Sequence, residues 1–161
     1  MTGPVIDLTA SRRARVLVVD DDRQSAATLT GVLGAAGFDV ATVRTNRLAV
    51  RVVLDERVAV VLVANTGRGI AATTDLVALL RGRPEPQLRA AGIVALVDDQ
   101  IDAAFGLGDE ADAVLVRPLD AARLVDVVTE VAATDPTART ARRTAGDGAF
   151  FRYRMGFAVT T

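Results

Sequence analysis

Five short segments rich in branched apolar residues recur along this chain, and segments with helical spacing of apolar residues separate them. The expected strands are Arg15–Val19, Val40–Arg44, Val58–Val63, Ile93–Val97 and Ala113–Val116. Continuous apolar runs are typical of strands buried on both faces, which occur in parallel sheets covered by helices. The alternation therefore predicts a doubly wound α/β fold, with five parallel strands and helices on both faces.

The intervening segments carry start and stop signals for five helices. Leu29 and Leu33 follow the first strand at helical spacing, and Gly37 is placed to end that helix. The second expected helix begins after Thr45-Asn46. The third runs from about Ala71 to Leu80, with Ala72, Leu76, Leu79 and Leu80 buried, and the fourth runs from Ile101 to Leu107. The fifth follows Asp120 and has a buried stripe of Leu124, Val127, Val128 and Val131. In such folds, function lies at the carboxyl ends of the strands.

Composition restricts the available chemistry. The chain has no Cys and no His, and all 19 of its basic residues are Arg. Thiol nucleophiles, imidazole or thiolate metal sites, Ser-His-Asp triads and lysine Schiff bases are therefore excluded. A net charge of −1 over 161 residues provides no global attraction to nucleic acid or membrane. The longest apolar run, 58–64, is too short for a signal peptide or a membrane span, so we expect a cytoplasmic protein without membrane contact.

The residues at the carboxyl ends of the expected strands form a recognisable series. Asp20-Asp21 follows the first strand, Ala64-Asn65 follows the third, Val97 ends the fourth and Arg117-Pro118 follows the fifth. Through this pattern, residues 14–133 resemble the receiver domain of bacterial response regulators. The resemblance implies a flavodoxin-like fold with strand order 2-1-3-4-5 and a phosphorylatable Asp at the end of the third strand. It also implies two acids that hold Mg²⁺, a Ser or Thr after the fourth strand, and a Lys-Pro with a cis peptide bond after the fifth.

The sequence departs from that pattern where phosphoryl transfer would occur. The acceptor position falls on Ala64, or on Asn65 with a one-residue shift, and neither can form an acyl phosphate. Val97 replaces the hydroxyl, Arg117 replaces the Lys, and a valine replaces the usual gate aromatic at position 114. We therefore expect an atypical, stand-alone receiver that is not an enzyme and signals through protein contacts without phosphorylation. The expected degenerate pocket comprises Asp20, Asp21, Ala64, Asn65, Val97, Arg117 and Pro118.

Three adjacent carboxylates at residues 20–22 repel one another unless a cation lies between them. Asp20 and Asp21 could hold Mg²⁺ weakly, with mostly water ligands, and no other cofactor is expected. Arg117 could instead bridge the two acids, which we favour because loss of the acceptor carboxylate removes a metal ligand. The acids could also simply cap the first helix and face solvent.

Two other functions stay open at this point. A non-standard Asp, namely Asp75, Asp98 or Asp99, could accept a phosphoryl group. Gly67–Ala72 fits a loose Gly-x-Gly-x-x-Ala dinucleotide fingerprint, which predicts a small-ligand or nucleotide-binding module. That motif follows the third strand instead of the first, and the acid at the matching distance is Glu85 in a Pro-rich loop.

The ends of the chain differ in composition from residues 14–133. We expect a leader over 1–13, a linker over 134–148 and a strand-like segment over 149–161. In the last segment apolar residues alternate with arginines, which suits addition to a sheet edge of a partner protein, of a second copy in a homodimer, or of its own domain. Nucleic acid is not an expected partner, since no helix-turn-helix follows. The expected partner-binding residues are Phe150, Phe151, Arg152, Tyr153, Arg154 and Phe157.

Overall fold

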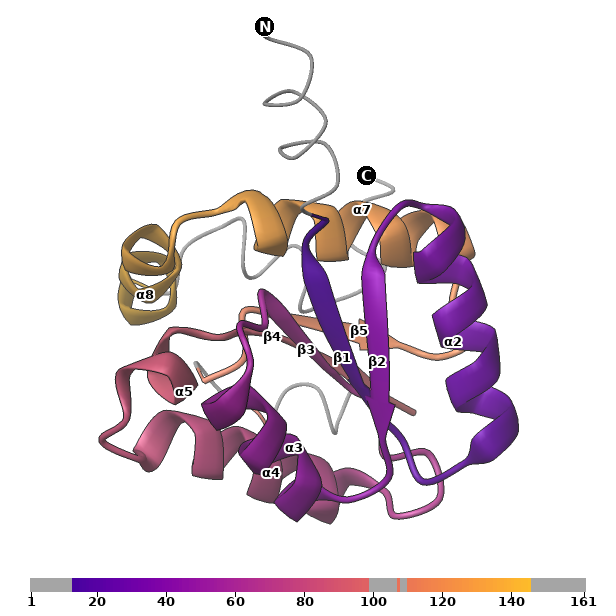
Figure 1. The fold of residues 1–161 in the computed structure, drawn as a ribbon, viewed down its shortest axis with the longest axis horizontal. Coiled ribbons are helices and arrows are strands. Elements are labelled where there is room, and N and C mark those ends of the chain that lie inside the picture. Colours follow the sequence, from indigo (N-terminus) through magenta and orange to yellow (C-terminus); the bar gives the residue numbers. More distant parts are fainter. Residues whose placement is uncertain (1–12, 99–106, 108–109, 146–161) are drawn as a thin grey trace, which may run out of the picture.

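The computed structural model describes residues 13–98, 107 and 110–145. Its centre is a five-stranded parallel sheet with the order β2-β1-β3-β4-β5 (Figure 1). The strands are β1 (Arg15–Val19), β2 (Asp39–Val43), β3 (Val60–Val63), β4 (Gly92–Val97) and β5 (Ala113–Val116). The predicted fold class and strand order are confirmed.

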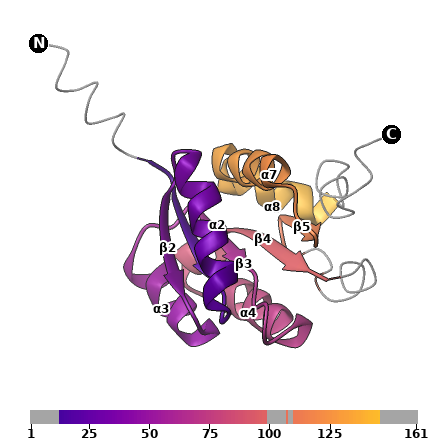
Figure 2. The same cartoon turned by 90° about the vertical axis from the view of Figure 1, so that its right-hand side faces the viewer.

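Helices cover both faces of the sheet. They are α2 (Arg23–Ala35), α3 (Asn46–Asp55), α4 (Ile70–Gly82), α5 (Pro86–Ala90), α7 (Ala121–Ala133) and α8 (Pro136–Ala145). Helices α2 and α7 pack on one face, and α3, α4 and α5 pack on the other (Figures 1 and 2). None of the helices in the described part of the chain has the length and apolar character needed to cross a bilayer.

The sheet divides the apolar interior into two layers. Along β1, Val16 and Val18 face α2 and α7, whereas Leu17 and Val19 face α3 and α4. All four side chains are fully buried, which explains why the strand reads as a continuous apolar run without alternation.

Short polar side chains begin three helices at positions that the sequence predicts. Asp22 accepts a hydrogen bond from the amide of Ser25 at 2.9 Å at the start of α2. Thr45 caps α3 and Asp120 caps α7 in the same way, each through a side-chain oxygen. Gly37, with φ of 101°, adopts the left-handed conformation just beyond α2.

The predicted buried face of α4 is partly wrong. Leu79 is 42% exposed, because the buried side chains are Thr73, Leu76, Val77 and Leu80, which lie on one helix face at positions i, i+3, i+4 and i+7. The sequence pattern also missed α5, a single short turn that starts at Pro86. The predicted helix over 101–107 lies outside the described residues, apart from Leu107.

The predicted linker over 134–148 is wrong for residues 136–145, which form α8. The prediction failed because α8 has few apolar residues and buries a charged one. Arg139 is buried, and its guanidinium donates to the backbone carbonyls of Val131, Thr134 and Ala90. The leader, apart from Arg13, and residues 146–161 lie outside the described residues. The latter include the predicted partner-binding residues Phe150, Phe151, Arg152, Tyr153, Arg154 and Phe157.

Candidate functional site

Asp20 and Ala64 lie side by side at the carboxyl edge of the sheet. Val19 and Val63 are paired residues at the ends of β1 and β3, and the amide of Ala64 donates to the carbonyl of Val19 at 2.9 Å. Asp20 and Ala64 are each 2% exposed. A methyl group therefore stands beside the buried carboxylate, at the position where the family resemblance implies a phosphorylated Asp.

Both oxygens of Asp20 accept hydrogen bonds from the protein. Oδ1 accepts from the amides of Asp22 at 3.2 Å and Thr66 at 3.0 Å, and Oδ2 lies 3.1 Å from Oγ1 of Thr66. The Thr66 hydroxyl is also 3.1 Å from Oγ of Ser25. Because a hydroxyl has one proton, Thr66 can donate it to Asp20 while accepting from its other neighbours.

Arg117 approaches Asp20 only through Thr66. Its Nη2 donates to Oγ1 of Thr66 at 3.2 Å and to the carbonyl of Ala64 at 3.1 Å. Its ion pair is with Asp98, at 3.1 Å between Nη1 and Oδ1. The expected bridge from Arg117 to Asp20 and Asp21 is therefore wrong, because the Thr66 hydroxyl lies between the groups and Asp98 takes the charged contact. The Arg117–Pro118 peptide bond is cis, as the resemblance implied.

Asp21 binds the loop that follows β3. Its Oδ1 accepts from the amide of Gly67 at 2.9 Å, and its Oδ2 is 4.0 Å from Nε of Arg68. A Cβ at position 67 would lie 2.5 Å from Oδ2 of Asp21. The glycine of the expected dinucleotide fingerprint thus faces a carboxylate. This geometry opposes phosphate binding at the loop, because the carboxylate occupies the space and repels an anion.

Asn65 connects this loop to α4. It is fully buried and has φ of 44°, a left-handed conformation that Asn tolerates better than most residues. Its Nδ2 donates to Oδ1 of Asn46 at 3.2 Å, and Asn46 in turn donates to the carbonyl of Ala72 at 2.8 Å. The amide side chain at the alternative acceptor position is therefore part of the structural framework of the loop.

The two valines at the positions where the resemblance implies a hydroxyl and a gate aromatic lie in the apolar core. Val97 is 3% exposed and Val114 is fully buried, and both belong to the layer that packs against α4. Neither can form a hydrogen bond to a phosphoryl group. The structure thus places both valines among apolar side chains of this layer.

The residues at this edge do not fit a magnesium site. Both oxygens of Asp20 and Oδ1 of Asp21 already accept hydrogen bonds from protein groups, and Ala64 supplies no ligand. In residues 13–98, 107 and 110–145, no group of three or more acidic, His or Cys side chains is arranged to hold a metal ion. The acids instead stabilise the Thr66-Gly67 loop.

A second polar cluster lies at the opposite, amino edge of the sheet, and sequence reasoning did not predict it. Asp112, just before β5, is 8% exposed and contacts Arg81 from α4 together with Arg139 and Arg143 from α8. These four residues are called the Asp112 cluster below. The one available sequence signal was the spacing of Arg139 and Arg143, which lie four residues apart. On a helix this spacing places both side chains on the same face.

Several solved structures of receiver domains and response regulators have the same fold as this chain. CheY4, a chemotaxis response regulator of Vibrio cholerae, matches with a TM-score of 0.64 and 21% identity, over 74% of this chain and 98% of that chain. The receiver domain of a signal transduction histidine kinase from Syntrophus aciditrophicus matches with a TM-score of 0.64 and 24% identity, over 74% and 89%. A CheY-like receiver domain from Methylobacillus flagellatus matches with a TM-score of 0.64 and 21% identity, over 74% and 98%.

These similarities show that the chain has the fold of response regulator receiver domains, with the CheY-like strand order. No protein-family model matches the sequence, and no curated protein matches it. These matches cover about three quarters of this chain and between 89% and 98% of the matched receiver domains.

Proposed function

We propose that this protein is a signalling module with the receiver fold that acts through protein–protein contacts and accepts no phosphoryl group. It is proposed to need no catalytic residue and no bound cofactor. The single observation that carries the proposal is the methyl group of Ala64, buried beside Asp20 where an acceptor carboxylate would have to stand.

The contacts of Thr66 support a pocket that is fixed without phosphate. In a phosphorylatable site, a cation and a hydrogen-bond donor would have to be available to stabilise the charge of the transferred group. Here the Asp20 carboxylate already accepts from Thr66, and the Arg117 guanidinium is already bound to Thr66, Ala64 and Asp98. Each charged group at this edge thus has a partner within the protein.

A protein-interaction role agrees with the chemistry of the chain. No Cys, His or Lys is present, and Asp20 and Asp21 serve as hydrogen-bond acceptors for backbone amides. The segment 149–161, with its alternating aromatic and basic residues, is the part we propose to bind the partner, which could be a second copy of the chain.

The test is incubation of the full chain with acetyl phosphate and Mg²⁺, and separately with beryllofluoride and Mg²⁺. Intact mass spectrometry should show no added phosphoryl group, and amide chemical shifts should not change with beryllofluoride. A phosphorylated Asp anywhere in residues 14–133 would overturn the proposal.

A second candidate function is a phosphoacceptor that uses Asp98. One observation favours it: Asp98 follows β4, its side chain is 69% exposed, and it lies 3.1 Å from the guanidinium of Arg117. An Asp98→Asn variant separates the two functions. If the wild type gains a phosphoryl group and the variant does not, Asp98 is the acceptor.

A further inference from the structure

Three guanidinium groups surround one carboxylate in the Asp112 cluster. Asp112 Oδ2 is 2.9 Å from Arg81 Nη2 and 3.8 Å from Arg139 Nε, and Oδ1 is 2.5 Å from Arg143 Nη1. The amide of Ile93 also donates to Oδ2 at 2.8 Å. With one acid against three bases, the cluster has an excess of two positive charges.

This excess charge is held away from bulk water. The side chains of Arg81 and Arg139 are each 7% exposed, and that of Arg143 is 11% exposed. Burial, together with the neighbouring Arg143 and Arg139, lowers the pKa of Arg81 to about 10 against the attraction of Asp112. Burial likewise lowers the pKa of Arg139. Uncompensated charge in such surroundings is costly, so an anion placed nearby would be strongly attracted.

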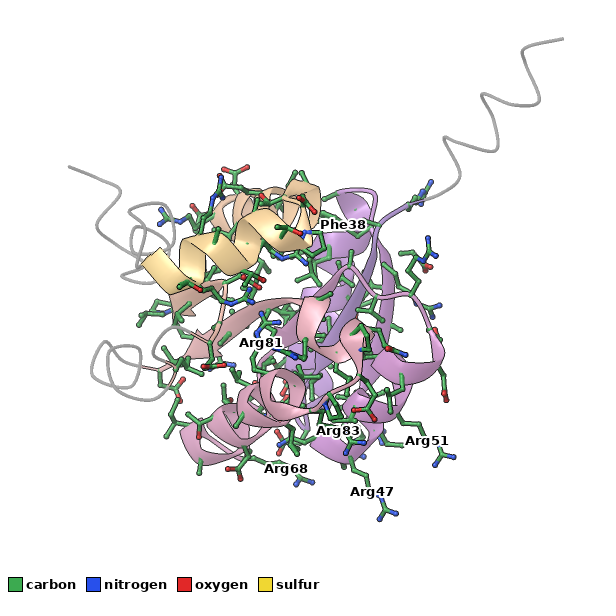
Figure 3. The ribbon with its side chains drawn as sticks, turned by 90° about the vertical axis from the view of Figure 1, so that its left-hand side faces the viewer. Phe38, Arg47, Arg51, Arg68, Arg81 and Arg83 are labelled. Atoms are coloured by element: carbon green, nitrogen blue, oxygen red, sulfur yellow. The ribbon has the colours of Figure 1, made fainter. Side chains whose placement is uncertain are left out.

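A groove beside the cluster has room for such an anion. One cavity of about 350 Å³ is lined by Arg81, Arg89, Glu110, Thr140, Arg143 and Thr144. A second, of about 340 Å³, is lined by Pro84, Pro86, Arg89, Ala90, Pro136, Thr137 and Thr140. The two cavities share Arg89 and Thr140, so they adjoin along α5 and α8, and we call them together the α5–α8 groove. Figure 3 shows Arg81 on the side of the molecule where α8 faces the α4 and α5 helices.

We propose that the α5–α8 groove binds a small phosphate monoester, with its phosphate in contact with Arg89 and attracted by the charges of Arg143 and of Arg81, whose guanidinium is itself bound to Asp112 and to backbone carbonyls. A phosphate monoester carries nearly two negative charges at neutral pH, which equals the excess on the Asp112 cluster, whereas a carboxylate carries only one. The proline-lined cavity then receives the organic part of the ligand. An acidic peptide would bring single charges spaced along a chain, which fits this one compact charged cavity less well.

The arginines differ in how they are held. Arg143 is fixed by Asp112 and by Thr140, to which its Nη2 donates at 3.2 Å. Arg89 is exposed, and its side chain has no hydrogen bond or ion pair within the described part of the chain. Its planar guanidinium is thus available to bind two phosphate oxygens at once. Glu110 is the one acid among the lining residues described, and its charge should weaken binding.

This inference does not rest on the proposed function. The groove lies at the amino edge of the sheet, since Asp112 and Ala91 precede β5 and β4. Asp20 lies at the carboxyl edge. The absence of phosphorylation by acetyl phosphate and the binding of a ligand in the groove are therefore tested independently, and either can fail without the other.

The test is titration calorimetry of the full chain at constant ionic strength with inorganic phosphate, AMP and adenosine as probes. Phosphate and AMP should bind, AMP more tightly, and adenosine should give no heat. Arg89→Gln should weaken AMP binding by about tenfold or more, because it removes a charged two-point contact. Glu110→Gln should strengthen it.

The matched control is Arg47→Gln, which removes an exposed arginine of α3 that points away from the body of the protein (Figure 3). Its AMP affinity should equal that of the wild type. The inference is overturned if neither phosphate nor AMP binds at millimolar concentration, or if Arg89→Gln and Arg47→Gln bind AMP equally. It is also overturned if a glutamate-rich peptide binds the groove and AMP does not.

Discussion

The backbone amide of Gly67 donates to Oδ1 of Asp21 at 2.9 Å, while any Cβ at position 67 would lie 2.5 Å from Oδ2 of the same carboxylate. The contact holds the loop after β3 against the acidic end of β1. A side chain at position 67 would therefore displace the Asp21 carboxylate, which gives the first glycine of the Gly-x-Gly pattern a structural role in this loop.

Gly67→Ala should lower the free energy of unfolding by about 1–3 kcal/mol, because the carboxylate or the loop must move. The control is Gly31→Ala on the exposed side of α2, where a Cβ meets no atom within 4 Å. That substitution should stabilise the protein by about 0.5–1 kcal/mol through helix propensity. Urea denaturation measures both. Equal effects of the two variants would show that Asp21 does not hold the loop.

Thr66→Val should destabilise the protein by about 1–3 kcal/mol, because it leaves Asp20 and Arg117 without their shared hydroxyl. Thr66→Ser keeps the hydroxyl and should retain most of the stability. If the serine variant loses as much as the valine variant, packing of the methyl group would be the cause instead of the hydrogen bonds.

Ala64→Asp should reduce stability, since it buries a second carboxylate beside Asp20 and like charges repel. Mg²⁺ should restore part of the loss, because a divalent cation offsets that repulsion. The melting temperature of the wild type should not change with Mg²⁺ at constant ionic strength. A wild-type increase with Mg²⁺ would contradict the conclusion that Asp20 and Asp21 do not form a metal site.

Asp112→Asn should cost about 3–5 kcal/mol, because three buried guanidinium groups then face a neutral amide. Asp126→Asn, on the exposed side of α7, is the control and should change stability by less than about 0.5 kcal/mol. Chemical denaturation of both variants gives the comparison. Similar values would mean that the Asp112 cluster contributes little to the fold.

Removal of residues 136–161 should destabilise the protein more strongly than removal of 146–161 alone. The longer deletion takes away Arg139 and Arg143, and with them the donors to Asp112 and to the carbonyls of Val131, Thr134 and Ala90. Thermal melts and solution mass of both truncated chains test this. Two deletions with equal melting temperatures would show that α8 is dispensable, and a change of mass with only 146–161 removed would assign self-association to that segment.

The sequence determined the fold because the features that specify it are local and periodic. Val16 to Val19 form an uninterrupted apolar run, which is typical of a strand buried on both faces. Asp22, Thr45 and Asp120 mark helix starts through bonds to residues two or three positions later. The prediction that no acceptor carboxylate stands at this edge could also be made from the chain, since Ala64 follows β3 directly.

The tertiary structure alone decided how the charged groups pair. From the sequence, several acids were possible partners for Arg117. In the structure its guanidinium binds the Thr66 hydroxyl and Asp98. Arg81, Asp112 and Arg143 are separated by about thirty residues each, and only the packing of α4, β5 and α8 brings them together. Hydrophobic periodicity repeats within one element and can be read along the chain, whereas an ion pair depends on the position of two elements in space.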